Sequence, residues 1–407
     1  MARFIKKFKK ATRKFLRHPW AKWAALGVLG AGVLLAAALL LLPEEAPAAP
    51  TFGPNSTTIT LVAGGDLNVT DNTVASGQTG SGYDYTAPFL DVAEIFARAD
   101  AAVLNFEGNL CGAPYGSATV SAPAAMIQSL NAMGVDFLQM ANSCPIKNGI
   151  LGLQQTLGSI RSAGIEPLGA YESNAEATRQ QGFTLREIGG VRVALVAFTK
   201  GMDGMGLPAG SENCVNLLYT DYTTTYKKVN TPGITKVLEA VEAAKPDITI
   251  ALLHWGSEGN SVISPSQEKI AKLMLSLGVD AIIGTHSHQV QSVVYDQEKG
   301  TLVAYSLGDF YGDGLLSGSY YSILLQLQIT KDLDTGYTAI TGWEHIPLYT
   351  VTGARDGSPM QVLQIRRAME LYENDHISAV SKATYENMQT ALEQIEKRIQ
   401  PPVKDKK

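Results

Sequence analysis

Short apolar runs rich in β-branched residues recur along the chain, and each ends at or near a polar residue. The runs TTITLVAGGD, AAVLN, VRVALVAFT, DITIALLHW, GVDAIIGTH and TLVAYSLGD occupy residues 57–66, 101–105, 191–199, 247–255, 278–286 and 301–309. Continuous apolar runs of this kind are typical of strands that are buried on both faces. Apolar residues at helical spacing lie between them, over 121–133, 150–163, 234–245 and 265–277. Strands that alternate with helices predict an α/β fold.

Two later segments follow other patterns. Residues 318–343 alternate apolar and polar side chains on both sides of Asp334-Thr335-Gly336, which predicts an antiparallel hairpin with its turn at these three residues. From Asp375 onward, apolar residues recur at three- and four-residue steps, which predicts an amphipathic helix. Such a helix packs either on its own domain or on a partner.

Residues 23–42 (WAALGVLGAGVLLAAALLLL) contain no charged side chain. A helix of about 20 residues spans roughly 30 Å, the hydrocarbon thickness of a bilayer. Residues 1–22 carry nine Lys and Arg and no acid, so the positive-inside rule places the N-terminus in the cytoplasm. A cleaved signal peptide is the alternative, with a weak cleavage site at Ala46-Pro47-Ala48, but its apolar region would usually be about 7–15 residues. We therefore expect a single-pass protein of the cell membrane with an extracytoplasmic main domain.

The remaining organisation follows from composition. Residues 43–56 are rich in Pro and Ala and predict an extended linker. Residues 57–350 are expected to form the main domain, and residues 351–407 a C-terminal helical extension and tail.

The net charge is −5 although the N-terminal segment is basic, so the rest of the chain is acidic and nucleic acid is not an expected partner. The three cysteines (Cys111, Cys144 and Cys214) allow at most one disulfide, and the sequence does not identify the pair.

Polar residues collect where the predicted strands end, and the carboxyl ends of parallel strands meet at one edge of a sheet. These residues are Asp66, Asn105, Glu107, Asn142, His254, His286 and His288. Imidazole and carboxylate ligands suit zinc, manganese or iron. Six or more ligands are too many for one tetrahedral ion and fit two divalent ions about 3.5–4 Å apart, bridged by one carboxylate. The alternative is that these groups are caps and core contacts that hold no metal.

The motifs Gly-Gly-Asp, Asn-Phe-Glu, Ala-Asn, His-Trp-Gly-Ser-Glu, Gly-Thr-His-Ser-His and Tyr-Ser-Leu-Gly-Asp follow one another in this order. Their order and spacing resemble the CapA family of poly-γ-glutamate capsule proteins, a branch of the calcineurin-like metallophosphoesterases, over about residues 57–350. The resemblance implies a four-layer α/β/β/α sandwich. It also implies a dinuclear site whose metal ligands are Asp66, Glu107, Asn142, His254, His286 and His288.

Four further residues belong to these motifs or lie beside them. Glu258, the last position of the His-x-Gly-x-Glu motif, would orient His254 or help to bind substrate. Asn105 is a candidate substrate-binding residue. Asp309 stands where the family has Asn, and Asn68, two residues after Asp66, is either a weak ligand or a turn residue.

One departure from the family concerns chemistry. The family has Ala-Asn-Asn-His with an Asp three residues on, whereas this chain has Cys144 at the His position and Lys147 at the Asp position. A thiol is a poorer proton donor at neutral pH, or it is tied in a disulfide. Loss of a general acid typically costs about 10²–10⁴-fold in rate. Cys144 is thus a doubtful catalytic residue, and Lys147 is a candidate contact for an anionic substrate.

The resemblance implies a membrane-anchored protein of capsule or poly-γ-glutamate synthesis, export or anchoring. Its expected partners are the membrane, an anionic envelope polymer and membrane synthase subunits. If active, it would be a metal-dependent, phosphoesterase-like hydrolase. The alternative function is a catalytically weakened binding or scaffold subunit of a polymer synthase complex, which the change to Cys144 favours.

Overall fold

The computed structural model describes residues 51–314, 316–353 and 360–400. The predicted cytoplasmic segment, the apolar segment at 23–42, most of the linker and the last seven residues lie outside this part of the chain. None of the helices in the described ranges has both the length and the apolar character needed to cross a membrane.

The first sheet has eight strands and is built around β1 (Ser56–Asn68). Its order is β14-β13-β12-β1-β2-β3-β4, and β11 pairs with β1 outside this path. β1 is parallel to β2 and β11 and antiparallel to β12. The other strands are β2 (Ala101–Glu107), β3 (Phe137–Gln139), β4 (Glu166–Leu168), β11 (Asp309–Tyr311), β12 (Tyr321–Asp332), β13 (Thr338–Thr352) and β14 (Met360–Gln364).

The second sheet has six strands in the order β5-β6-β7-β8-β10-β9. Its four central strands are parallel, and β5 and β9 pair antiparallel at the two edges. The strands are β5 (Phe183–Ile188), β6 (Val191–Thr199), β7 (Ile248–His254), β8 (Ala281–Thr285), β9 (Val293–Asp296) and β10 (Thr301–Ala304).

The two faces of β6 belong to different hydrophobic cores, because successive side chains of a strand point to opposite faces. Val193 and Leu195 join the core that includes the first sheet. Val196 and Phe198 join a second core with buried residues of α8 (Thr231–Ala244) and α9 (Pro265–Ser276). The second sheet therefore lies between the first sheet and these two helices.

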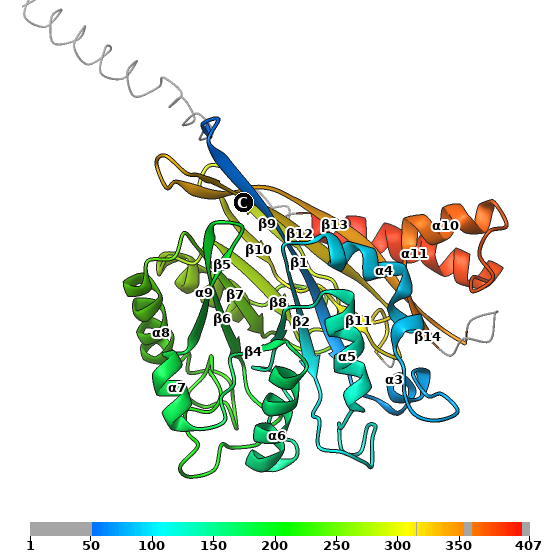
Figure 1. The fold of residues 1–407 in the computed structure, drawn as a ribbon, viewed down its shortest axis with the longest axis horizontal. Coiled ribbons are helices and arrows are strands. Elements are labelled where there is room, and N and C mark those ends of the chain that lie inside the picture. Colours follow the sequence, from blue (N-terminus) through cyan, green and yellow to red (C-terminus); the bar gives the residue numbers. More distant parts are fainter. Residues whose placement is uncertain (1–50, 315, 354–359, 401–407) are drawn as a thin grey trace, which may run out of the picture. The chain divides into compact units, whose positions relative to one another are not determined.

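Helices α4 (Thr86–Arg98), α5 (Ala124–Met133) and α6 (Gly149–Ser162) contribute their buried residues to the core of the first sheet. Figure 1 shows α4 and α5 on the opposite side of the strands from α8 and α9. The remaining helices are α3 (Asp71–Ser76), α7 (Asn174–Gln180), α10 (Ile365–Glu373) and α11 (Lys382–Ile399). The prediction of an α/β fold is confirmed, with two sheets.

Several local predictions are confirmed, because they depend on side-chain spacing within one segment. The predicted hairpin is β12–β13, and at its turn Asp332 Oδ1 accepts the N–H groups of Asp334 (3.0 Å) and Thr335 (2.9 Å). The predicted C-terminal helix is α11, which buries Met388 and Ile395 in the protein's own core. Of the two alternatives, packing on its own domain or on a partner, the helix therefore packs on its own domain. The first sheet continues through β13 and β14 beyond residue 350, into the range expected to be a helical extension.

Asp280, just before β8, gives a pH-dependent prediction. Its Oδ2 accepts the N–H of Thr249 at 2.7 Å, and burial raises its pKa to about 6, against the lowering effect of that hydrogen bond. Because the folded pKa lies above the unfolded value, this carboxyl's contribution to stability is full below about pH 4 and is lost as the pH rises through about 6.

We expect Asp280→Asn, which keeps an acceptor for Thr249 and cannot ionise, to be more stable than the parent at pH 7.5. The expected gain is roughly 1–3 kcal/mol in the free energy of unfolding, since one pKa unit corresponds to about 1.4 kcal/mol. The gain should disappear at pH 4. Urea denaturation at both pH values measures it, and an equal difference at the two pH values would contradict this account.

Candidate metal centre

The predicted ligands come together at the carboxyl ends of strands from both sheets. The first sheet supplies Asp66 from β1, Glu107 from β2 and Asn142 from the loop after β3. The second sheet supplies His254 from β7, and the loop after β8 supplies His286 and His288. Asp66, Asn142 and His254 are completely buried, and the His288 side chain is 12% exposed. The strand-end pattern in the sequence thus identified residues that are neighbours in space.

Asp66, Glu107 and His254 form the inner cluster, with one ligand atom of each within 4.8 Å of the others. His254 Nδ1 lies 3.5 Å from Glu107 Oε1 and 3.9 Å from Asp66 Oδ1. Burial raises the pKa of Glu107 well above its usual range, and the negative charge of Asp66 raises it further. Burial, followed by the neighbouring histidines, lowers the pKa of His254 well below its usual value. The imidazole is therefore neutral at neutral pH, which is the form that binds a metal.

Asp66, His288 and Asp309 form the second cluster, again with ligand atoms within 4.8 Å. His288 Nδ1 lies 2.7 Å from Asp309 Oδ1 and 3.7 Å from Asp66 Oδ2. Burial acts to lower the pKa of His288, but Asp309, Asp66 and Glu107 outweigh it and raise this pKa to about 11. Asp66 belongs to both clusters. Asp309 was absent from the predicted ligands. It is the first residue of β11 and pairs with Asp66 across the sheet.

Asn105 connects the acids, and its predicted role in substrate binding stays a prediction. Its Nδ2 donates to Asp66 Oδ1 at 2.6 Å and to Glu107 Oε1 at 3.2 Å, and its Oδ1 accepts from Asn142 Nδ2 at 3.1 Å. The residue is only 1% exposed, and both ends of its amide are hydrogen-bonded. Asn105 therefore holds the acids in place through hydrogen bonds at both ends of its amide.

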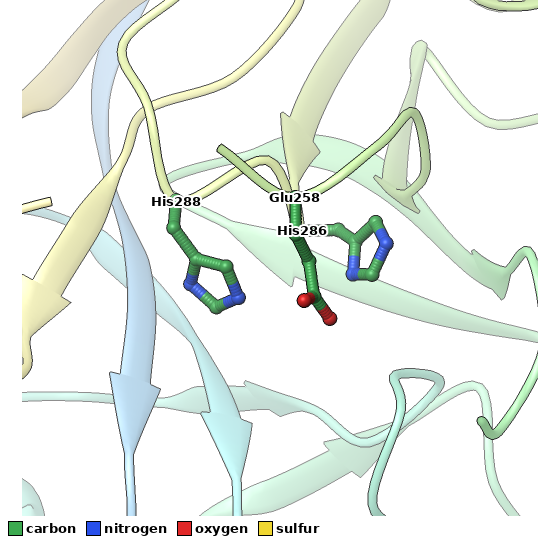
Figure 2. A group of neighbouring side chains, drawn as sticks. All are labelled: Glu258, His286 and His288. Atoms are coloured by element: carbon green, nitrogen blue, oxygen red, sulfur yellow. The ribbon is translucent and has the colours of Figure 1, made fainter. Parts of the chain in front are cut away.

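Glu258, His286 and His288 form a third group, whose side chains lie beside one another in Figure 2. The ring nitrogens of His254 lie 3.1 Å from Ser143 Oγ and 3.1 Å from Thr285 Oγ1, whereas Glu258 is grouped with His286 and His288. Substrate binding by Glu258, the other predicted role, stays a prediction. Two residues after His254, the chain turns at Gly256, whose φ is +82°. The turn takes Glu258 to the loop that follows β8.

Lys200 is a residue of this site that the sequence interpretation missed. It directly follows β6, the neighbour of β7, so the same strand-end argument would have included it. Its Nζ lies 3.0 Å from His286 Nε2 and donates to the carbonyl of Gly256 at 3.1 Å. Burial lowers the pKa of Lys200, against the opposite effect of Glu258.

These donors fit a divalent metal. Asp66, Glu107 and Asp309 bring three carboxylates into a buried place, where negative charge without a countercharge is costly. Among the described side chains, His286 Nδ1 is the one buried nitrogen or oxygen atom without a hydrogen-bond partner. A bound cation would neutralise the carboxylates and give this nitrogen a partner. The residues that would hold it are Asp66, Glu107, Asn142, His254, His286, His288 and Asp309.

A cleft of about 240 Å³ opens beside the second cluster and is lined by Glu107, Cys144, His288 and Asp309, among others. Burial, and then the charge of Glu107, raise the pKa of Cys144 well above its usual range, so the thiol is neutral at neutral pH. The three cysteines are unpaired, so the disulfide considered for Cys144 is not formed.

The two remaining candidates lie at the edge of this region. Asn68 is the last residue of β1 and lines the cleft, so it is not a turn residue. Lys147 is exposed and is not among the described residues that line the cleft, and its contact with an anionic substrate stays a prediction.

Fold and site together define a two-sheet α/β protein with a buried histidine–carboxylate centre of the kind that binds metals. The family described as bacterial capsule synthesis protein PGA_cap matches residues 60–314. The chain belongs to this family, and the resemblance seen in its motifs is confirmed.

Two curated relatives are capsule proteins of bacilli. The chain is 27% identical over 223 residues to the PGA biosynthesis protein CapA of Bacillus subtilis (strain 168), covering 53% of this chain and 52% of the relative. It is 28% identical over 246 residues to the capsule biosynthesis protein CapA of Bacillus anthracis, covering 60% of this chain and 54% of the relative. The match therefore spans about half the length of these relatives.

Solved structures similar to this chain include the calcineurin-like phosphoesterase YfkN from Bacillus subtilis. It has a TM-score of 0.43 and 15% sequence identity, with 84% of this chain and 99% of that chain covered. At this identity the likeness concerns the fold alone.

Proposed function

We propose that this protein is a membrane-anchored, CapA-like component of the synthesis, export or anchoring of an anionic envelope polymer such as poly-γ-glutamate. Family membership and the two relatives named for capsule and PGA biosynthesis support the process. The apolar segment at 23–42 and its basic flank support the anchor and the extracytoplasmic domain. Membrane synthase subunits are the partners that such a location would make accessible.

The proposed centre holds two divalent ions, with zinc, manganese and iron as candidates. The observation that carries this proposal is that Asp66 belongs both to the cluster with Glu107 and His254 and to the cluster with His288 and Asp309. When bound, such ions polarise phosphoryl or carbonyl oxygens and lower the pKa of coordinated water. The chain's own contribution is to fix the carboxylates through Asn105, which is hydrogen-bonded to Asp66 and Glu107.

A second candidate function is a binding or scaffold subunit with weak or no hydrolysis. Cys144 favours it, because a neutral buried thiol is a poor replacement for the general acid that the family has at this position. In this alternative the metals would bind carboxylates of the polymer. Metal-dependent turnover of a generic phosphodiester discriminates the two, since only the enzymatic function requires it.

The first test is the metal content of the purified full-length protein, with Glu107→Ala and His288→Ala beside it. We expect about two equivalents of a transition metal in the parent, as in two-ion sites, and a clear loss in both variants. Elemental analysis of samples prepared without chelators gives the number directly.

Glu298→Ala and His376→Ala are the matched controls, because both residues are exposed and lie outside the three groups of the site. They should retain the parental metal content. A parent without metal would contradict the dinuclear centre and leave only a binding domain.

A further inference from the structure

Glu258 lies on an exposed loop, yet its carboxylate is next to two largely buried histidines. One ligand atom each of Glu258, His286 and His288 lies within 4.8 Å of the others. Figure 2 shows the carboxylate beside both imidazole rings. The two other clusters of the centre share Asp66, whereas this group does not contain it. Glu258 therefore belongs to the outer side of the centre, near His286.

Backbone contacts fix the loop that carries Glu258. On one side of it, the carbonyl of Gly256 accepts a hydrogen bond from Lys200 Nζ at 3.1 Å. On the other side, the N–H of Gly259 donates to the carbonyl of Ser287 at 2.9 Å, between the two histidines. Both glycines have positive φ, +82° at Gly256 and +68° at Gly259, which glycine adopts at little cost. The position of Glu258 is thus fixed by the two turns at Gly256 and Gly259, each of which is held by a hydrogen bond.

The charged neighbour of Glu258 does not account for its position. Lys200 Nζ makes its hydrogen-bond contacts with Gly256 and His286, and no ion pair joins Glu258 to a basic residue in the described part of the chain. Next to this carboxylate, His286 has its Nδ1 atom buried without a hydrogen-bond partner. Two imidazoles and one carboxylate at this separation form a common ligand set for a divalent metal, and open positions on the ion remain for water or substrate.

We infer that Glu258 is itself a metal ligand, which acts with His286 and His288 and closes the outer side of the centre. This inference rests on the proposed metal centre and adds a residue that neither the motif nor the two Asp66 clusters assign to it. Because Glu258 is exposed while the other ligands are largely buried, it is the ligand that solvent reaches first.

Titration of the full-length protein with Mn²⁺ tests the inference, with free Mn²⁺ followed by electron paramagnetic resonance. Glu258→Gln removes the charge, and Glu258→Ala also removes the amide oxygen with which Gln could still coordinate. We expect both variants to bind one of two equivalents at least about 10–100-fold more weakly, since loss of even an outer-shell partner has an effect of that size. The other equivalent should keep its parental affinity.

Glu268→Gln, an exposed glutamate of α9 outside the three groups, is the control and should bind as the parent does. Thermal unfolding should be unchanged in all variants, because substitutions of exposed side chains usually change stability little. Parental affinity for both equivalents in the Glu258 variants would overturn the inference and leave the dinuclear centre intact. Equal weakening of both equivalents would also overturn it, because Glu258 is absent from the two Asp66 clusters. A parent that binds no Mn²⁺ would overturn the inference together with the metal centre.

Discussion

Asp66→Asn is expected to abolish tight binding of divalent metal, with both equivalents lost together. The physical reason is that Asp66 is the carboxylate that belongs both to the group with Glu107 and His254 and to the group with His288 and Asp309. Its Oδ2 also accepts the backbone N–H of His286 at 3.0 Å, while its Oδ1 accepts from Asn105 at 2.6 Å. An asparagine has one carbonyl oxygen and one NH₂ group, so its NH₂ group would face either Asn105 Nδ2 or the N–H of His286, both of which are donors. The variant would therefore lose one of these two hydrogen bonds as well as the negative charge of Asp66.

The size of the effect should exceed the 10–100-fold loss of affinity that follows removal of an outer-shell partner. Isothermal titration with Zn²⁺ or Mn²⁺ measures it. Asp296→Asn is the matched control, because this aspartate forms a surface ion pair with Lys299, and such pairs contribute little. Retention of one tightly bound equivalent in Asp66→Asn would show that Asp66 does not bridge two ions.

Gly65→Ala is expected to give the largest loss of stability among single-methyl substitutions at this site. A Cβ at Gly65 would lie 1.7 Å from the carbonyl oxygen of Gly308 and 2.9 Å from its carbonyl carbon. Both atoms are backbone, so a change of rotamer cannot relieve the overlap. The strand must move away from the segment that leads to Asp309, and the hydrogen bond from Asp66 N–H to Gly308 O (3.0 Å) must break.

We expect Gly65→Ala to lower the free energy of unfolding by about 3 kcal/mol or more, the upper range for overpacked positions. Because the strand carries Asp66, metal affinity should fall with it. Urea denaturation and metal titration check the two effects. Gly80→Ala is the control, since nothing lies within 4 Å of its added Cβ, and it should remain within about 0.5 kcal/mol of the parent. A parental stability for Gly65→Ala would mean that β1 and the 307–309 segment are further apart than described.

The fold was largely predictable because its elements are encoded by short-range patterns. The predicted strands correspond to β1, β2, β6, β7, β8 and β10, and the helices to α5, α6, α8 and α9. The predicted start of α9 at residue 265 matches the structure, in which Ser264 and Gln267 form a capping box and Pro265 occupies the first turn. The distribution of strands between two sheets was not encoded in any single segment, because it depends on which apolar faces meet.

The candidate ligands were predictable for a related reason. Parallel strands end at the same edge of a sheet, so residues that directly follow them meet in space even when they are far apart in sequence. Asp66 and His286, separated by 220 positions, are joined by a hydrogen bond of 3.0 Å. That rule predicts that Asp66, Glu107, His254, His286 and His288 lie together, and the same rule applied to β6 would have added Lys200. Asp309 begins β11, and its pairing with Asp66 across the sheet brings it to the site.

What the sequence determined by itself is therefore most of the central strands and helices, the strand ends that carry the chemistry and the family to which the chain belongs. Only the tertiary structure decided which partner each polar side chain of the site contacts. It made Asn105 a buried connector of acids and placed Glu258 beside His286 in place of His254. It also explained the second glycine of the Gly-Gly-Asp motif by the close approach of Gly308. These features depend on distances of a few ångströms between segments up to hundreds of residues apart, and no local pattern of side chains encodes them.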